Sequence, residues 1–509
     1  MAPEAPELAR HLVVRAEARR QESSASLDST QRGKLGQFFT PAPAADFIAS
    51  LARLPATGTL RILDPGAGAG SLTASLVARL LAERPEVKIS VTACEIDPQL
   101  HEVLQATLDD CVKTADQLAV HLEVELVRGD FISWATEGDG LFSAPPEPFD
   151  IIIMNPPYKK LAARSRERNL VSAACTETSN LYSAFMALGV NLLTPGGQLV
   201  AITPRSFANG PYFRPFRQYF LERMHLDRVH IFEARNKVFA DTDVLQENVI
   251  FAATRTVTAE RAPVVVSTSR SYSDEVRQRS APYTEMVHPG DSECFIHISA
   301  DERDTELAAS HASLPSTLPD LGLKVSTGRV VDFRSRNHLR PDPVPGSVPL
   351  IYPLHMRDGA INWPVHGAKK NNAIMLNEET EKLTFPQGYY VVVKRLSSKE
   401  EKRRVVAVIF DPDQIACERI GFENHVNVFH AAGAGLPKDI ARGLCHWLNS
   451  TILDRFIRRF SGHTQVNATD LRNLRYPNLE QLSKIGQLWD TDAWPEQEKI
   501  DELVDQIIK

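Results

Sequence analysis

Cysteine is scarce in this 509-residue chain, which has six, at positions 94, 111, 175, 294, 417 and 445. No two of them stand in the Cys-x-x-Cys spacing of zinc-binding or redox-active pairs. We therefore expect no metal site, and we expect the thiols to be reduced, as in a cytoplasmic protein.

Long hydrophobic runs are also missing. No stretch approaches the roughly 18 apolar residues of a membrane-spanning helix, and the N-terminus alternates apolar and charged residues without the apolar core of a signal peptide. We expect neither membrane contact nor secretion. Aromatic residues make up only 7%, but 43% hydrophobic residues against 24% charged ones indicate folded domains rather than a disordered chain.

The chain as a whole has no excess of positive charge. Lys and Arg number 57 against 64 Asp and Glu, and a net charge of −7 taken alone argues against binding to nucleic acid. The cations are clustered, however. Net charges of +4, +4, +4, +4 and +3 fall in residues 159–170, 201–240, 321–340, 391–410 and 451–476, which leaves −26 for the rest. A phosphate-binding surface on an acidic protein requires such segregation, although a single charged run is more often a solvated face.

Short apolar runs alternate with helical patterns from residue 33 onward. The runs, typical of buried strands, are 60–64, 88–94, 122–128, 149–154, 197–203, 228–232 and 247–254. Helical stretches such as 71–84 and 179–193 separate them. This alternation predicts an α/β domain with a mostly parallel sheet covered on both faces.

The alternation stops after residue 255, and from about 320 Pro and Gly interrupt the strand-like runs. We therefore predict a domain boundary near residue 310. An amphipathic helix at 1–20 is followed by polar residues 21–33, which we expect to form a linker or mobile loop. The predicted organisation is an N-terminal helix and linker at 1–32, the α/β domain at 33–310, a second domain at 311–480 and a C-terminal helical segment at 481–509. In that last segment, Ile500, Leu503, Val504, Ile507 and Ile508 have the spacing of a helix docked on the body.

A glycine-rich turn follows the first predicted strand. Residues 62–70, ILDPGAGAG, place Asp64 at the strand end and glycines at 66, 68 and 70 before a helix. Glycines let the backbone approach a ligand, and a helix N-terminus favours negative groups. Glu95 ends the next strand, where a carboxylate can bind a ribose. Together, the glycine turn and Glu95 favour a site for a nucleotide-like ligand. The alternative is that the glycines only form a tight turn and that Glu95 is a solvated acid at a strand end.

Polar residues also end the third and fourth strands. Asp130 lies in RGDF at 128–131, and Asn155 begins the tetrapeptide Asn-Pro-Pro-Tyr. The carboxyl ends of parallel strands line one crevice, so we expect Asp64, Glu95, Asp130 and Asn155 to converge. The alternative, a turn that merely stops a strand, does not explain the aromatic residue at position 158.

Six motifs in this order resemble those of the gamma class of amino DNA methyltransferases, the TaqI-like N6-adenine enzymes of restriction–modification systems. They are LGQFFTP (35–41), DPGAGAG (64–70), EIDP (95–98), GDF (129–131), NPPY (155–158) and GGQLVAITP (196–204). The resemblance covers about residues 33–255. It implies a Rossmann-like methyltransferase domain that depends on S-adenosylmethionine, followed by a C-terminal target-recognition domain. One departure is DPGAGAG, where relatives often have DPACGSG.

The resemblance also implies which residues bind S-adenosylmethionine. They are Thr40, Asp64, Gly66, Gly68, Gly70, Glu95, Ile96, Asp130 and Phe131. Glu95 would bind the ribose and Asp130 the adenine amino group. Ile96 and Phe131 would contact the two faces of the adenine ring.

The expected catalytic residues are Asn155, Pro156, Pro157 and Tyr158. An adenine amino group is a poor nucleophile because its lone pair is delocalised into the ring. The Asn155 side-chain oxygen and the Pro156 carbonyl can accept hydrogen bonds from its two N–H groups and push the nitrogen toward tetrahedral geometry. Tyr158 offers a face for a base flipped out of the duplex. The family implies Phe239 as a second aromatic contact, and a core phenylalanine is its alternative.

The second domain contains candidate DNA contacts. They are Lys394, Arg395, Arg403, Arg404, Arg458, Arg459, His463 and Gln465. A buried, hydrogen-bonded turn is an equal alternative for the last two. Residues 461–477 and 423–430 resemble recognition segments of the PstI/BsuBI-type group, which implies a six-base palindrome. We expect double-stranded DNA as the partner, a cognate restriction endonuclease linked in function but not bound, and a monomer or weak dimer.

Two other functions stay open. Asn-Pro-Pro-Tyr also occurs in release-factor glutamine methyltransferases, whose chains are much shorter and lack a basic C-terminal domain. A non-catalytic DNA-binding specificity module could retain the fold, but the intact motif at 155–158 argues against it.

Overall fold

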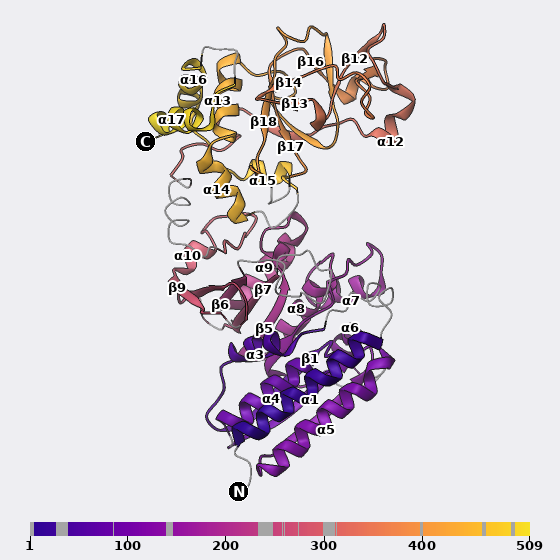
Figure 1. Ribbon diagram of the computed structural model, residues 1–509, viewed down its shortest axis with the longest axis vertical. Coiled ribbons are helices and arrows are strands. Elements are labelled where there is room, and N and C mark those ends of the chain that lie inside the picture. Colours follow the sequence, from indigo (N-terminus) through magenta and orange to yellow (C-terminus); the bar gives the residue numbers. More distant parts are fainter. Residues whose placement is uncertain are drawn as a thin grey trace. The chain divides into compact units, whose positions relative to one another are not determined.

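The computed structural model describes residues 5–26, 39–84, 86–138, 146–232, 248–256, 258, 260–272, 274–298, 311, 313–397, 401–460, 465–489 and 494–508, without the side chains of 211, 459 and 460. The chain divides into two compact units, Met1–Ala300 and Asp301–Lys509 (Figure 1).

Unit 1 is built on a mixed sheet with the strand order β3-β2-β1-β4-β5-β7-β6-β8-β9. The strands are β1 Gly58–Pro65, β2 Val87–Glu95, β3 Leu122–Arg128, β4 Phe149–Met154, β5 Leu193–Pro204, β6 Met224–Phe232, β7 Asn248–Arg255, β8 Val264–Ser269 and β9 Arg277–Ala281. The first five are parallel, and β7 runs antiparallel to both β5 and β6. The α/β fold expected from the alternation is confirmed.

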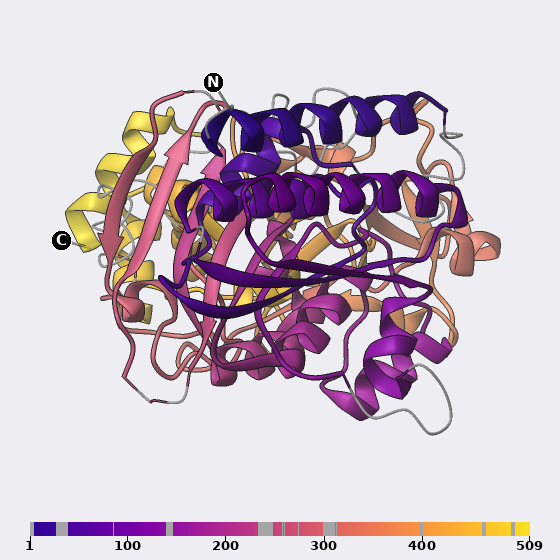
Figure 2. The same ribbon diagram turned by 90° about the horizontal axis from the view of Figure 1, so that it is seen from below.

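Helices cover both faces of this sheet. The helices are α1 Ala5–Ser26, α3 Ala42–Ser50, α4 Ser71–Glu83 and α5 Pro98–Gln117 on one face, and α6 Phe131–Glu137, α7 Arg166–Ala174, α8 Leu181–Leu192 and α9 Arg214–Arg223 on the other. Helices α1, α4 and α5 lie side by side (Figures 1 and 2). Alternate strand residues enter opposite cores, since Ile62 packs with the first group of helices and Leu63 with the second.

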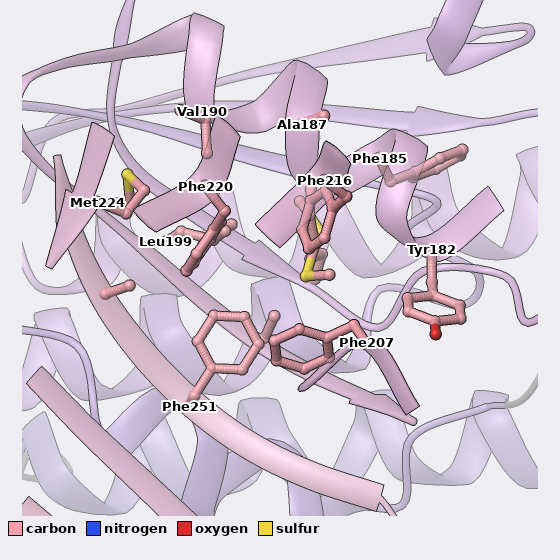
Figure 3. Packing of buried hydrophobic residues seen from close by; sticks show 14 of the residues in the cluster. Tyr182, Phe185, Ala187, Val190, Leu199, Phe207, Phe216, Phe220, Met224 and Phe251 are labelled. Atoms are coloured by element: carbon pink, nitrogen blue, oxygen red, sulfur yellow. The ribbon is translucent and has the colours of Figure 1, made fainter. Parts of the chain in front are cut away.

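The core under α8 and α9 supports the carboxyl edge of the central strands. Phe216 and Phe220 of α9 pack with Phe207, which follows β5, and with Phe251 of β7 (Figure 3). Short helices follow the strands here, namely η1 Arg205–Ala208, η2 Pro211–Phe213 and α10 Tyr283–Met286. This packing joins the turn after β5 to α9 and β7.

The N-terminal helix is longer than expected. Residues 21–26, which we assigned to a linker, continue α1 to Ser26. The buried Ser23 hydroxyl donates to the Arg19 carbonyl, which satisfies the side chain inside a helix. Arg15 and Arg19 also form ion pairs with Asp110 of α5. The helix is therefore tied to unit 1.

Unit 2 has short strands in two sheets. One has the order β10-β20-β17-β18-β14-β13 and the other β11-β15-β12-β19-β16. Their bounds are β10 Lys324–Thr327, β11 Leu339–Arg340, β12 Ser347–Ile351, β13 Met356–Arg357, β14 Ala360–Ile361, β15 Ala373–Met375, β16 Thr384–Pro386, β17 Tyr390–Lys394, β18 Ala407–Phe410, β19 Arg419–Phe422 and β20 Val426–His430.

The helices of unit 2 follow mainly in its C-terminal part. They are α12 Asp332–Ser335, η4 Arg336–His338, η5 Pro353–His355, η6 Glu381–Leu383, α13 Lys438–Leu448, α14 Thr451–Phe460, α15 Ala468–Arg472, α16 Leu479–Gln487 and α17 Gln497–Ile508. The predicted terminal helix is confirmed, because α17 buries Ile500, Leu503 and Val504 and packs on α13, α14 and α16. No helix within the described part of the chain is long and apolar enough to cross a membrane.

Candidate active site

The carboxyl ends of the parallel strands of unit 1 surround a pocket of about 490 Å³. Among the residues expected at the site, the structure places eight in its wall, namely Gly66, Gly68, Glu95, Ile96, Asp130, Phe131, Asn155 and Pro157. They follow four different strands and lie far apart in the sequence. Parallel pairing brings them to one edge.

The glycine loop after β1 has a backbone that only glycine adopts easily. Gly66, Gly68 and Gly70 have φ values of +75°, +59° and +84°. The Gly66 and Ala67 amides both donate to the Cys94 carbonyl at 2.9 Å, which ties the loop to β2. Gly70 precedes α4, and a Cβ there would lie 3.0 Å from side-chain atoms of α5. Gly66 and Gly68 leave bare backbone at the pocket.

Glu95 ends β2 and holds the loops on either side of it. Its two carboxylate oxygens accept hydrogen bonds from the Gly68 and Asp97 amides, each at 2.8 Å. The side chain is 3% exposed, and burial raises its pKa above the ordinary value. The backbone donors therefore orient a carboxylate at the pocket wall.

Asp64 does not line the pocket, contrary to our expectation. Its carboxyl group is fully buried behind the glycine loop and accepts a hydrogen bond from the Thr73 hydroxyl of α4 at 2.7 Å. Burial raises its pKa to about 7. A strand-end carboxylate can point to either side of the sheet edge, and this one joins β1 to α4.

Asp130 caps helix α6. Its carboxylate accepts hydrogen bonds from the Ile132 and Ser133 amides at 3.3 and 3.1 Å, and from the Ser133 hydroxyl at 2.9 Å. The next residue, Phe131, is buried with its ring 4.8 Å from that of Phe185. On the wall after β2, Ile96 is 50% exposed. The pocket thus has an apolar contact after β2 and another after β3.

The Asn155 amide is held on both sides. Its Nδ2 donates to the Thr40 hydroxyl oxygen at 3.0 Å, and the Tyr158 hydroxyl donates to its Oδ1 at 2.9 Å. The same hydroxyl lies 3.3 Å from the Ile202 carbonyl. These contacts orient Oδ1 as the acceptor. Thr40, which we expected to bind the cofactor, lies buried beside Asn155.

Tyr158 remains a hydrogen-bond donor over a wide pH range. Burial raises the pKa of its hydroxyl well above the ordinary value. Its ring meets Tyr182 edge to face, with ring centroids 6.2 Å apart. Pro156 is buried, and Pro157 faces the pocket. Two consecutive prolines end the β4 hydrogen-bonding ladder, because neither has an amide hydrogen.

Two exposed lysines line the pocket although the sequence analysis did not assign them to the site. Lys159 and Lys160 line the pocket directly after the Asn-Pro-Pro-Tyr segment, and neither forms an ion pair with any described residue. Arg166, also in the wall, pairs with Glu137 at 2.5 Å. The net charge of +4 over 159–170 was the signal that could have identified them.

Most of the cations expected to contact DNA in unit 2 bind groups of the chain itself. Arg404 is fully buried, its amide donates to Asp454 Oδ1 at 2.6 Å and its guanidinium binds the Ser397 carbonyl, so its assignment to DNA was wrong. Arg403 binds the Asn449 carbonyl.

The other expected DNA contacts of unit 2 are also engaged within the chain where they are described. Lys394 pairs with Glu401 at 2.9 Å and Arg458 with Asp454 at 2.7 Å. Arg395 donates to Gln465 Oε1 at 3.4 Å. Phe239, His463 and the side chain of Arg459 lie outside the described residues.

The fold and the pocket define a class. The strand order β3-β2-β1-β4-β5-β7-β6 with β7 antiparallel, a glycine loop after β1 and Asn-Pro-Pro-Tyr after β4 identify a Rossmann-like methyltransferase fold. The family described as "Eco57I restriction-modification methylase" matches residues 99–239.

Comparison with known proteins identifies the family. The chain is 42% identical over 490 residues to the type II methyltransferase M.PstI of Providencia stuartii, covering 96% of each chain. It is 42% identical over 459 residues to M.BsuBI of Bacillus subtilis, covering 89% of this chain and 90% of that one. The chain therefore belongs to the type II methyltransferases of restriction–modification systems.

A solved structure shares the fold. The type IIL restriction-modification enzyme MmeI in complex with DNA aligns with a TM-score of 0.54 at 10% identity, over 88% of this chain and 69% of the other.

Proposed function

We propose that the protein transfers a methyl group from S-adenosylmethionine to the N6 amino group of adenine at a specific site in double-stranded DNA. The observation that carries this proposal is the Asn155 amide, whose oxygen is oriented as an acceptor in the pocket that also contains the glycine loop and Glu95. The proposed role is protection of DNA from a cognate restriction endonuclease in the cytoplasm.

The pocket suits S-adenosylmethionine, which would supply an electrophilic methyl group on its sulfonium. Glu95 offers carboxylate oxygens to ribose hydroxyls, and bare backbone at Gly66 and Gly68 allows close approach. Ile96 and Phe131 provide apolar contacts for a purine ring, and Asp130 an acceptor for its amino group. Asp64 and Thr40 would act indirectly, through Thr73 and Asn155.

The chain's own contribution to the reaction is to prepare the nucleophile. Asn155 Oδ1 and the Pro156 carbonyl would accept hydrogen bonds from the two amino N–H groups, so that the nitrogen lone pair is directed at the methyl group. The methylated nitrogen would then release one proton to water. An sp² oxygen has two lone pairs, so Oδ1 can accept from Tyr158 and from the target amine together. The base must leave the duplex to reach the pocket, and the Tyr158 ring would stack on it.

DNA as the partner is supported by the family and by charge. Lys159 and Lys160 place exposed cations at the pocket, where the backbone of a strand with a flipped base would pass. The solved MmeI structure contains DNA.

Methyl transfer from labelled S-adenosylmethionine to plasmid DNA tests the proposal. After digestion to nucleosides, mass spectrometry should find N6-methyladenine, and N4-methylcytosine would overturn the assigned base. Asn155→Ala should nearly abolish transfer while calorimetry shows cofactor affinity largely retained, because the side chain acts on the nucleophile. Asn155→Asp should retain more activity, since a carboxylate still accepts. Full activity of Asn155→Ala would refute the mechanism.

A further inference from the structure

We propose that unit 2 contacts DNA through an aromatic and basic patch formed by Phe333, Arg334, Arg336 and Lys369, an assignment that rests on the proposed function. Phe333 would stack against bases or wedge between them, and the cations would bind phosphates. Phe333, Arg334 and Arg336 lie in the segment 321–340 of net charge +4, but none of the four patch residues is among the individual DNA contacts expected from the sequence.

Exposure and charge single out this segment. Phe333 in α12 is 70% exposed, and Arg334 and Arg336 beside it are exposed as well. The Arg334 guanidinium lies 5.4 Å from the Phe333 ring centroid. Neither arginine forms an ion pair with any described residue. A single exposed aromatic side chain is common on protein surfaces, but one flanked by two such arginines is suited to nucleic acid.

The acid of this segment does not cancel its charge. Asp332 accepts the Tyr352 hydroxyl and the Lys370 ammonium group, each at 2.7 Å. Lys370 thereby neutralises Asp332 and brings the exposed Lys369 near α12. The patch therefore presents three cations that pair with no acid among the described residues.

Two neighbouring arginines differ from Arg334 and Arg336 because their guanidinium groups bind backbone carbonyls. The Arg329 guanidinium lies 4.1 Å from the Phe385 ring centroid and binds the Lys382 and Thr384 carbonyls at 3.3 and 3.4 Å. Arg340 binds the Asn337 carbonyl at 3.0 Å. These two cations hold loops in place, as Arg403 and Arg404 do. Within the described part of the chain, Arg334 and Arg336 have no such structural task.

The patch is also separated from the helical part of unit 2. Helix α12 lies at the opposite end of the unit from α13, α16 and α17 (Figures 1 and 2). By contrast, Arg403 binds the Asn449 carbonyl directly after α13, and Arg458 is itself a residue of α14. Double-stranded DNA is the occupant whose phosphates match these cations and whose base steps an exposed aromatic ring can enter as a wedge.

The test measures the binding of full-length variants to a linear plasmid fragment as salt is varied. For each phosphate that a variant no longer neutralises, the slope of log K against log salt should fall in magnitude by about 0.9. The double variant Arg334→Ala/Arg336→Ala should therefore lower it by about 2. Its matched control, Lys484→Ala/Lys499→Ala, removes two exposed cations that pair with Glu480 and Glu502 and should leave the slope unchanged.

Phe333 is tested separately because stacking is not ionic. Phe333→Ala should weaken binding by about 5- to 150-fold with an unchanged salt slope, and Phe333→Trp should retain affinity. A wild-type circular dichroism spectrum and thermal unfolding curve would show that each full-length variant is folded. If the wild type binds and methylates DNA while the patch variants match the control pair, the patch is not the DNA-contacting surface. If the wild type does neither, the proposed function itself fails.

Discussion

Removing the Tyr158 hydroxyl tests whether the orientation of the Asn155 amide controls the rate. Tyr158→Phe keeps the ring but loses the hydrogen bonds to Asn155 Oδ1 and to the Ile202 carbonyl, at 2.9 and 3.3 Å. A neutral hydrogen bond contributes about 0.5–1.5 kcal/mol net, which corresponds to a rate loss of about 2- to 13-fold if the bond maintains the productive amide. With the amide free to turn, its NH₂ group would face the target amine and could accept no hydrogen bond from it.

Thr40 should act on the same amide from the other side. Thr40→Val removes the acceptor of Asn155 Nδ2 at 3.0 Å and nearly preserves volume, so we expect a loss of similar size. Thr40→Ser retains the hydroxyl and should recover most of the rate. The double variant Thr40→Val/Tyr158→Phe should lose less than the product of the two single effects, because both act through one side chain.

Single-turnover methyl transfer at saturating DNA measures these effects, and calorimetry measures cofactor affinity. We expect the rate to fall without a change in cofactor affinity, since in the proposed mechanism these hydrogen bonds act through Asn155 on the nucleophile. A wild-type rate in Tyr158→Phe would refute the reasoning, as would a Thr40→Ser variant as slow as Thr40→Val. The raised pKa of the Tyr158 hydroxyl also predicts that no loss of rate at mildly alkaline pH depends on this residue.

Three other predictions concern stability. The Asp64 carboxyl has a pKa of about 7 when folded and about 3.9 when unfolded, so the folded state binds more protons between these values and loses stability as pH rises through this range. Asp64→Asn keeps an acceptor for Thr73 but does not titrate, so the Tm of the variant relative to that of the wild type should rise between pH 5 and 8. A Tm difference that stays constant over this range would contradict the prediction. Gly70→Ala should lower stability by more than Gly196→Ala, because φ is similar at +84° and +82° but only Gly70 is crowded, and equal Tm losses would argue against it. Arg404→Ala should cost about 2–5 kcal/mol of unfolding free energy in denaturant titration and leave the DNA salt slope unchanged, whereas a flattened slope would return Arg404 to the DNA surface.

Local pattern was enough to predict the fold and the place of the pocket. The apolar runs correspond to β1 through β7, and parallel strands must end at one edge. Glu95 and Asn155 could therefore be assigned to one site from the sequence alone. The reason is that strand ends, glycine turns and prolines are encoded by neighbouring residues.

The direction and the partners of polar side chains were decided only by tertiary structure. Asp64 and Glu95 both end buried strands, yet one binds Thr73 behind the loop and the other lies in the pocket wall. Arg404 and Arg334 both belong to segments of net charge +4, yet one is fully buried and the other is exposed. A sequence specifies each charge, but hydrogen-bond acceptors tens of residues away determine whether that charge stabilises the fold or remains available to a partner.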